Sequence, residues 1–99
     1  MVKRTLPEIQ SDLQQLKPTL KARFGIEKLE IFGSYIRGEQ TEKSDIDLLV
    51  TFDNAYSLWR LIDAERYLKR KLCLKVDLVP ADSVKLALKN KIFSEATAV

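Results

Sequence analysis

The segment that most constrains the fold is 46–52, because it is apolar at nearly every position. An apolar run of this length, with β-branched residues and no alternation, is typical of a strand that is buried on both faces. Such a strand needs other elements on each side of it to exclude water. We therefore expect an α/β fold, in which helices pack on a small mixed β-sheet.

The N-terminal third of the chain predicts helix. Thr5 can cap the first turn, and Glu8 stands three residues later, as a capping box requires. Apolar residues then recur at spacings of three and four, which is the period of one helical face. They are Ile9, Leu13, Leu16, Leu20 and Phe24. Pro18 interrupts this stripe, so we expect a kink or break near Lys17, a second short helix from Pro18, and a stop at Gly25.

The rest of the chain alternates between strand and helix patterns with short connections. Strands are expected at 29–32, 46–52 and 72–79, a short helix at 34–38, a longer helix at 55–71, and a last helix that Asp82 or Ser83 caps and that runs to residue 92. No linker, repeat or low-complexity segment occurs in the 99 residues. The chain is therefore expected to be one domain, residues 1–99, with one modest core.

Composition restricts the available chemistry. The chain has no histidine and one cysteine. This excludes a histidine base, a histidine-ligated zinc ion, and every nucleophile that depends on a histidine partner. Cys73 lies among apolar residues, and we expect it to be a small core residue that forms no disulfide. Any active site must use carboxylates, hydroxyls, Lys, Arg and backbone amides.

Charge and hydropathy bear on partners and location. The net charge of +3 is mild, and the densest basic stretch is 66–75. That stretch is either the solvated face of a helix or a patch for an acidic partner or a nucleic-acid backbone. No run approaches 18 apolar residues, and the N-terminus lacks the apolar block of a signal peptide. We therefore expect no membrane association and a cytoplasmic location.

Gly33 and Ser34 stand where a predicted strand passes into a short helix that Gly38 closes. Free backbone amides at such a junction point to one spot, and the helix dipole adds partial positive charge there. The junction therefore suits an anion such as phosphate, and the serine hydroxyl can donate to it. Gly-Ser pairs are also common in ordinary turns, so this feature alone does not identify a site.

Three acidic residues lie in, or directly before, the two predicted strands that follow. Asp45 and Asp47 are two positions apart, so they point to the same face of a strand. Paired carboxylates are costly unless a cation lies between them, and Mg²⁺ prefers such hard oxygen ligands. Asp77 lies inside an otherwise apolar strand, where an acidic side chain needs a partner. The alternatives are that one aspartate of the pair caps a turn while the other is solvent-exposed, and that Asp77 faces water on an edge strand.

The combined pattern is that of a two-metal site for phosphoryl or nucleotidyl transfer. Gly33-Ser34, ten residues, Asp45-x-Asp47 and a later strand Asp77 resemble the nucleotidyltransferase superfamily typified by DNA polymerase β. The small size and the longer strings at 33–38 and 44–50 resemble the minimal nucleotidyltransferases (MNT), over nearly the whole chain. The resemblance implies a minimal palm-like fold.

The resemblance also implies an activity and a partner. Members of this family resemble the antitoxins of type VII-like toxin–antitoxin modules, whose partners are all-helical HEPN ribonuclease toxins. The implied reaction is Mg²⁺-dependent transfer of AMP from ATP to a hydroxyl, expected to be that of a tyrosine, of the HEPN toxin with which the chain forms a hetero-oligomer.

Site roles follow from the same resemblance. Gly33 and Ser34 would hold the triphosphate. Asp45 and Asp47 would bind two Mg²⁺ ions. Asp77 would share one ion and assist deprotonation of the attacking hydroxyl.

Two further residues complete the nucleotide-binding expectation. Arg37, on the short helix, would either meet phosphate oxygens or tie the loop down, and both roles stay open at this point. Tyr35 is bulkier than the small residue expected at its position. A bulkier side chain there would narrow the pocket, so the nucleotide preference stays open.

Two other functions compete with catalysis. The chain could be an antitoxin that neutralises its partner by binding alone, with Tyr56, Trp59 and Tyr67 either forming an interface or packing into the core. A weaker alternative is nucleic-acid binding through 66–75.

Overall fold

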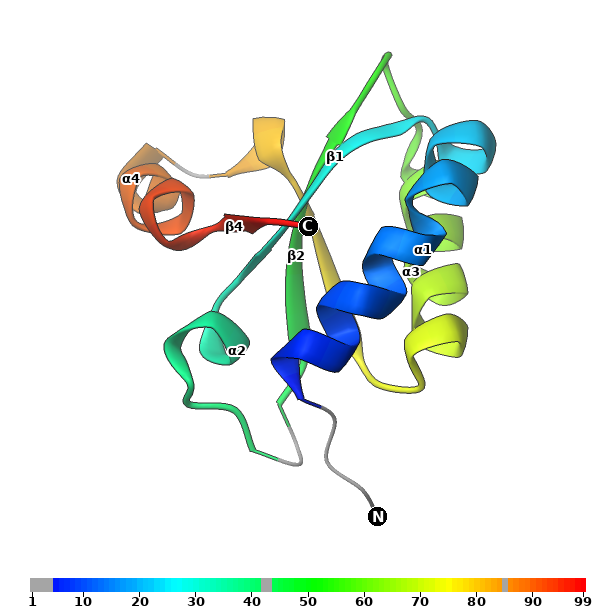
Figure 1. The fold of residues 1–99 in the computed structure, drawn as a ribbon. Helices are drawn as coiled ribbons and strands as arrows, with labels where there is room; N and C mark the ends of the chain where they lie inside the picture. The colour runs from blue at the N-terminus through cyan, green and yellow to red at the C-terminus, as the bar shows by residue number, and fades with distance from the viewer. Residues whose placement is uncertain (1–4, 42–43, 85) are drawn as a thin grey trace.

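The computed structural model describes residues 5–41, 44–84 and 86–99. In chain order the elements are α1 (Leu6–Phe24), β1 (Ile26–Phe32), α2 (Ser34–Arg37), β2 (Ile46–Phe52), α3 (Leu58–Leu72), β3 (Val76–Pro80), the 3₁₀ turn η1 (Ala81–Ser83), α4 (Leu86–Glu95) and β4 (Thr97–Ala98). The strands form one sheet in the order β3-β2-β1-β4 (Figure 1). β2 is parallel to β3, whereas β1 is antiparallel to both of its neighbours. The expected α/β class with a small mixed sheet is confirmed.

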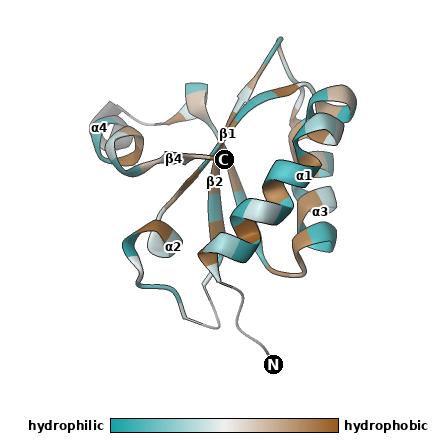
Figure 2. Cartoon of the chain, viewed as in Figure 1, coloured by the Kyte–Doolittle hydropathy of each residue, from teal (hydrophilic) through white to brown (hydrophobic). Residues whose placement is uncertain are grey.

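Helices lie on both sides of this sheet. α1 and α3 cover one face, and α4 lies on the other side (Figure 1). Ile46, Leu48 and Val50 alternate along β2 and join one buried apolar cluster with the inner faces of α1 and α3. The hydrophobic and hydrophilic bands along both helices follow this division (Figure 2). Leu49, on the opposite face of β2, is 1% exposed, so the predicted burial on both faces is correct.

α1 begins as predicted but does not break. Thr5 Oγ1 accepts a hydrogen bond from the Glu8 amide at 3.4 Å, and Gly25 ends the helix with φ of 69°. Between them α1 is continuous through Pro18, so the predicted break and second short helix are wrong. Pro18 and Gln14, whose carbonyl loses its partner, both lie on the exposed face, where water can replace the missing hydrogen bond. The buried stripe on the other face holds the helix together.

Several predicted boundaries move by a few residues. β1 begins three residues earlier than expected, because Ile26 already pairs with Phe52 of β2. β3 begins at Val76 and not at Leu72, because Leu72 still belongs to α3. α4 runs to Glu95, beyond the predicted end at residue 92, and β4 was not predicted. Within the described ranges, no helix combines the length and apolar character that crossing a membrane requires.

Cys73 is exposed, so its prediction as a core residue is wrong. It caps the C-terminus of α3 in the left-handed conformation, with φ of 56°. The chain reverses direction there, between the buried residues Leu72 and Val76. The apolar residues around Cys73 are therefore no guide to its own exposure, because Cys73 lies at the turn. Two of the aromatic residues considered for an interface differ in exposure. Tyr67 packs in the core, with its ring centroid 5.4 Å from that of Phe24, whereas Trp59 is 75% exposed.

We expect Cys73→Gly to raise the free energy of unfolding by about 0.5–1 kcal/mol, because glycine adopts positive φ without steric cost. Cys73→Val should lower the free energy of unfolding, because a β-branched residue is a poor fit to this conformation. Urea denaturation measures both changes. A core cysteine would show the reverse order, with valine tolerated and glycine leaving a cavity.

Candidate functional site

Three strand ends bring the candidate residues to one edge of the sheet. Asp47 is the second residue of β2, and its direct neighbours across the sheet are Phe32 of β1 and Asp77 of β3. Because β2 and β3 are parallel and in register here, Asp47 and Asp77 point to the same face. Gly33 and α2 follow immediately after Phe32. The Gly33–Ser34 bend, the junction of β1 with α2, therefore lies beside the paired aspartates.

The acidic side chains interact electrostatically. Burial, reinforced by the charges of Asp77 and then Asp45, raises the pKa of Asp47 to about 6. Partial desolvation of its carboxylate, with the charges of Glu65 and Asp45, also raises the pKa of Asp77. Asp45 itself is exposed, one residue before β2. Asp45, Asp47 and Asp77 therefore form one region of negative electrostatic potential.

Gly33 is in closest contact with this acidic group. Its backbone has φ of 83° and ψ of −151°, a combination that is essentially restricted to glycine. A Cβ atom there would overlap Asp47 Oδ2 and lie 3.0 Å from Asp47 Cγ. The Asp47 carboxylate therefore packs directly against the glycine backbone, and this contact requires glycine.

Ser34 and Arg37 lie on α2, beside this contact. Ser34 is half-buried, and its hydroxyl has no hydrogen bond to another residue of the described part of the chain. Arg37 Nε donates to Glu39 Oε1 at 2.8 Å, and Arg37 Nη1 donates to Glu95 Oε2 at 3.1 Å. The hydrogen bond to Glu39 is the largest cause of the raised pKa of Arg37, and the charges of Glu39 and Glu95 add to it. This geometry favours the loop-tying role of the two considered for Arg37.

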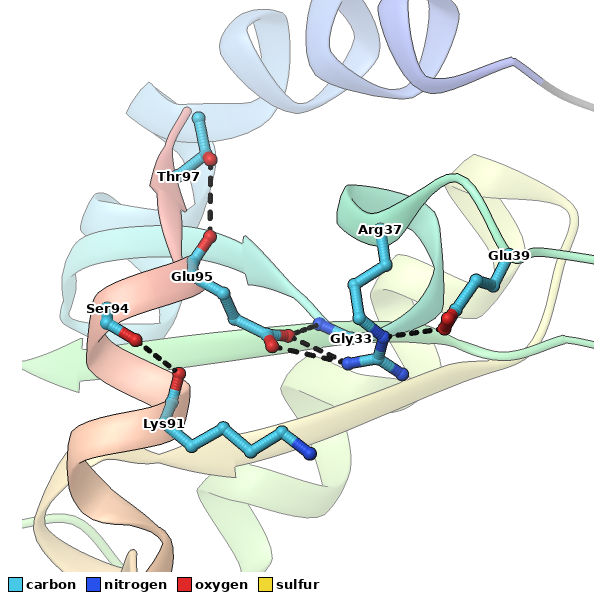
Figure 3. Close-up of polar contacts among 7 residues, drawn as sticks. All are labelled: Gly33, Arg37, Glu39, Lys91, Ser94, Glu95 and Thr97. Atoms are coloured by element: carbon cyan, nitrogen blue, oxygen red, sulfur yellow. Dashed lines mark hydrogen bonds and ion pairs between the residues drawn. The ribbon is translucent and has the colours of Figure 1, made fainter.

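Sequence reasoning missed Glu95. This side chain accepts hydrogen bonds from the Gly33 amide at 2.6 Å and from Arg37, so it contacts the bend directly (Figure 3). Glu95 lies 62 residues from Gly33 along the chain. No local pattern marks it, because its position depends on where α4 ends relative to β1.

The donor set suits a hard cation but does not enclose one. Among the residues in the described ranges, no group of three or more acidic, cysteine or histidine side chains closes tightly enough to hold a metal ion. Mg²⁺ commonly binds proteins through one or two carboxylates and takes its other ligands from water and substrate phosphates. The carboxylates of Asp47 and Asp77, with Asp45 close by, match that limited contribution.

Two other surface features, the basic stretch 66–75 and a hollow with aromatic residues in its wall, lie away from the acidic group. Arg66, Lys69, Arg70, Lys71 and Lys75 are all exposed, on α3 and the turn after it. A hollow of about 800 Å³ lies at the opposite end of β2, with Phe52, Tyr56 and Phe93 in its wall. Neither feature includes a residue of the acidic group.

The family of nucleotidyltransferase domains matches residues 13–99. The chain belongs to this family. It is 42% identical over its full length to protein adenylyltransferase MntA of Thermococcus cleftensis, which it also covers completely. These matches confirm the sequence-based identification of a nucleotidyltransferase.

Solved structures agree on the fold. A chain provisionally described as a minimal nucleotidyltransferase superposes with a TM-score of 0.84 at 28% identity, with complete coverage of both chains. A complex of a tri-AMPylated HEPN toxin of Shewanella oneidensis with its MNT antitoxin matches with a TM-score of 0.67 at 20% identity. That match covers 91% of this chain and 70% of the other, and it supports the fold alone.

The raised pKa of Asp47 makes stability depend on pH. Between about pH 4 and pH 6 the folded protein holds a proton on Asp47 that the unfolded chain has released, so this contribution to stability is lost as pH rises through 6. Asp47→Asn is neutral throughout. At pH 7.5 this substitution should raise the free energy of unfolding by about 1 kcal/mol, a value reduced for solvent screening because the side chain is half-exposed. Below about pH 4 it should leave the free energy of unfolding unchanged.

Urea denaturation in the presence of EDTA measures this difference at both pH values. Asp63→Asn, on the exposed face of α3, controls for a general change in net charge. An Asp47→Asn gain that is equal at pH 4 and pH 7.5 would contradict the electrostatic account.

The contact between Gly33 and Asp47 predicts a large cost for a methyl group. Gly33→Ala should lower the free energy of unfolding by about 3 kcal/mol, since it combines backbone strain with overlap onto the Asp47 carboxylate. Gly38→Ala is the matched control, because Gly38 also has positive φ, 71°, but a methyl group there would meet no atom of the described residues within 4 Å. It should cost only about 1 kcal/mol. Equal costs in denaturation would exclude the close contact.

Proposed function

We propose that this chain transfers AMP from ATP to a hydroxyl, that of a tyrosine, on a HEPN-type toxin, and that it is the antitoxin of a type VII-like module. The observation that carries the proposal is the pairing of Asp47 with Asp77 across parallel strands, directly beside the Gly33–Ser34 bend. This arrangement puts carboxylates next to the bend at which the sequence predicts phosphate binding, and two-metal phosphoryl and nucleotidyl transfer uses both features.

Mg²⁺ fits the donor set of this edge. The candidate ligands are carboxylate oxygens, and burial, followed by repulsion from Asp77 and Asp45, raises the pKa of Asp47, as expected for a cluster that no cation neutralises. Asp45 and Asp47 would hold two ions, with Asp77 sharing one of them. When bound, the ions supply neutralisation of phosphate charge and a lowered pKa of the acceptor hydroxyl.

The chain's own groups carry out the remaining steps. Ser34 Oγ, which is not engaged by another described residue, donates to a phosphate oxygen and orients the triphosphate. The acceptor oxygen attacks the α-phosphorus, the bond from that phosphorus to the bridging oxygen breaks, and pyrophosphate leaves. Asp77, whose pKa is raised, accepts the proton of the acceptor hydroxyl. No histidine base is required, in keeping with a chain that has none.

The acceptor is proposed by analogy with what the similar proteins are named for. The Thermococcus relative is named as a protein adenylyltransferase and is matched over its entire length. The Shewanella complex joins an MNT antitoxin to a HEPN toxin that carries three AMP groups. An acceptor side chain that a partner protein presents also suits a single small domain, because the partner completes the open side of the site.

Asp45→Asn and Asp47→Asn should each reduce AMP transfer at least about a thousandfold while leaving the fold intact, because each removes a charged ligand from the site. The assay incubates the chain with α-labelled ATP, Mg²⁺ and a purified HEPN-type toxin, and follows label on the toxin. Asp63→Asn is the matched control. Full transfer by either variant, or no transfer by the unmodified chain under any metal condition, would refute the proposed activity.

A second function is neutralisation by binding alone. It is favoured by the exposed apolar pair at the start of α3, Leu58 at 66% and Trp59 at 75%, which is a suitable protein contact. The double variant Asp45→Ala, Asp47→Ala separates the two functions. Growth protection against the toxin that survives in this variant would favour binding, and protection that is lost while the complex still forms would favour transfer.

A further inference from the structure

Glu95 is the last residue of α4, and its carboxylate reaches the Gly33–Ser34 bend from the far end of the chain (Figure 3). Oε2 accepts from the Gly33 amide at 2.6 Å, and the two carboxylate oxygens lie 3.1 and 3.2 Å from Arg37 Nη1. The Glu95 side chain is only 17% exposed. A charged acceptor in so shielded a position makes stronger hydrogen bonds than one in bulk water.

Arg37 connects this carboxylate to the rest of the bend. Its Nε is bound to Glu39, two residues further on, while its Nη1 is bound to Glu95. The guanidinium is thus held between one local and one distant carboxylate. Its positive charge also offsets the repulsion between Glu95 and Asp47, both of which would otherwise lie uncompensated next to Gly33.

The backbone around Glu95 is itself fixed. The Ala96 amide closes α4 on the Ile92 carbonyl at 2.9 Å, and β4 then pairs with β1. The Val99 amide donates to the Leu29 carbonyl at 3.1 Å, and Lys17 Nζ donates to the Val99 carbonyl at 3.0 Å. These contacts tie the C-terminal segment to α1 and to β1, the strand that leads into Gly33, and so hold the backbone next to Glu95 in place.

We propose that Glu95 is a positioning residue for nucleotide binding: by holding the Gly33 amide and Arg37, it keeps the bend seated against Asp47 so that Ser34 and the aspartates face one bound triphosphate. The inference rests on the proposed function. It predicts that Glu95 acts on ATP binding through Gly33 and makes no contact with the reacting atoms. The opposing arrangement is one in which the carboxylate occupies the phosphate position and competes with ATP.

Three variants of the full chain test this role. Glu95→Ala removes the acceptor, and Glu95→Gln keeps an oxygen for the Gly33 amide but removes the charge. Glu27→Ala, an exposed carboxylate on β1, is the control. Measurements are amide hydrogen exchange at Gly33, the Kd for ATP with Mg²⁺, kcat and KM in the transfer assay, and Tm.

In Glu95→Ala the amide of Gly33 should exchange about tenfold faster. The Kd and KM for ATP should each rise about tenfold, which is equivalent to about 1.4 kcal/mol. The kcat should stay within about threefold of that of the unmodified chain. Glu95→Gln should restore most of the protection and of the ATP affinity. The control should match the unmodified chain.

Tighter ATP binding by Glu95→Ala would overturn the inference in favour of competition. An unchanged rate of amide hydrogen exchange at Gly33 in Glu95→Ala would overturn the inference, even if the Kd for ATP changed. A glutamine variant as impaired as the alanine variant would also overturn it, because the Gly33 contact would then not be the route. Failure of the proposed function shows separately, as absence of ATP binding and transfer in the unmodified chain.

Discussion

The parallel register of β2 with β3 is the constraint on which the rest of the site depends. It sets Asp47 beside Asp77 on one face of the sheet, where burial and like charge raise the pKa of both carboxylates. This arrangement lowers stability when nothing neutralises it. A fold that keeps such a cluster maintains a destabilising feature at one edge of its sheet, which is characteristic of functional sites in otherwise well-packed proteins.

The acidic edge is joined to the chain's C-terminal segment through one glycine. Gly33 presents its backbone to the Asp47 carboxylate on one side and its amide to Glu95 on the other. Arg37 completes the arrangement by balancing the charge of Glu95. The site is therefore assembled from the middle of the chain and its C-terminal segment, and β4, which follows Glu95, is paired with β1.

The sequence was informative where local rules act. Helix caps at Thr5 and Gly25, the buried β2 strand and the nucleotidyltransferase motif follow from residue types at short spacing. Predictions from local rules were wrong where tertiary structure determined the conformation or the exposure of a residue. Pro18 stayed inside a helix because its missing hydrogen bond faces solvent, and Cys73 was exposed because the chain turns at that residue despite its apolar neighbours.

By itself the sequence identified the candidate site residues and their order along the chain, because the Gly33-Ser34 pair and the Asp45-x-Asp47 pair are local patterns of residue type and spacing. Only the tertiary structure decided that Asp77 aligns with Asp47, that Arg37 is engaged by glutamates, and that Glu95 reaches Gly33. Strand register and the docking of distant segments depend on contacts between residues far apart in the chain. A single sequence records the groups that make such contacts but not the pairing between them.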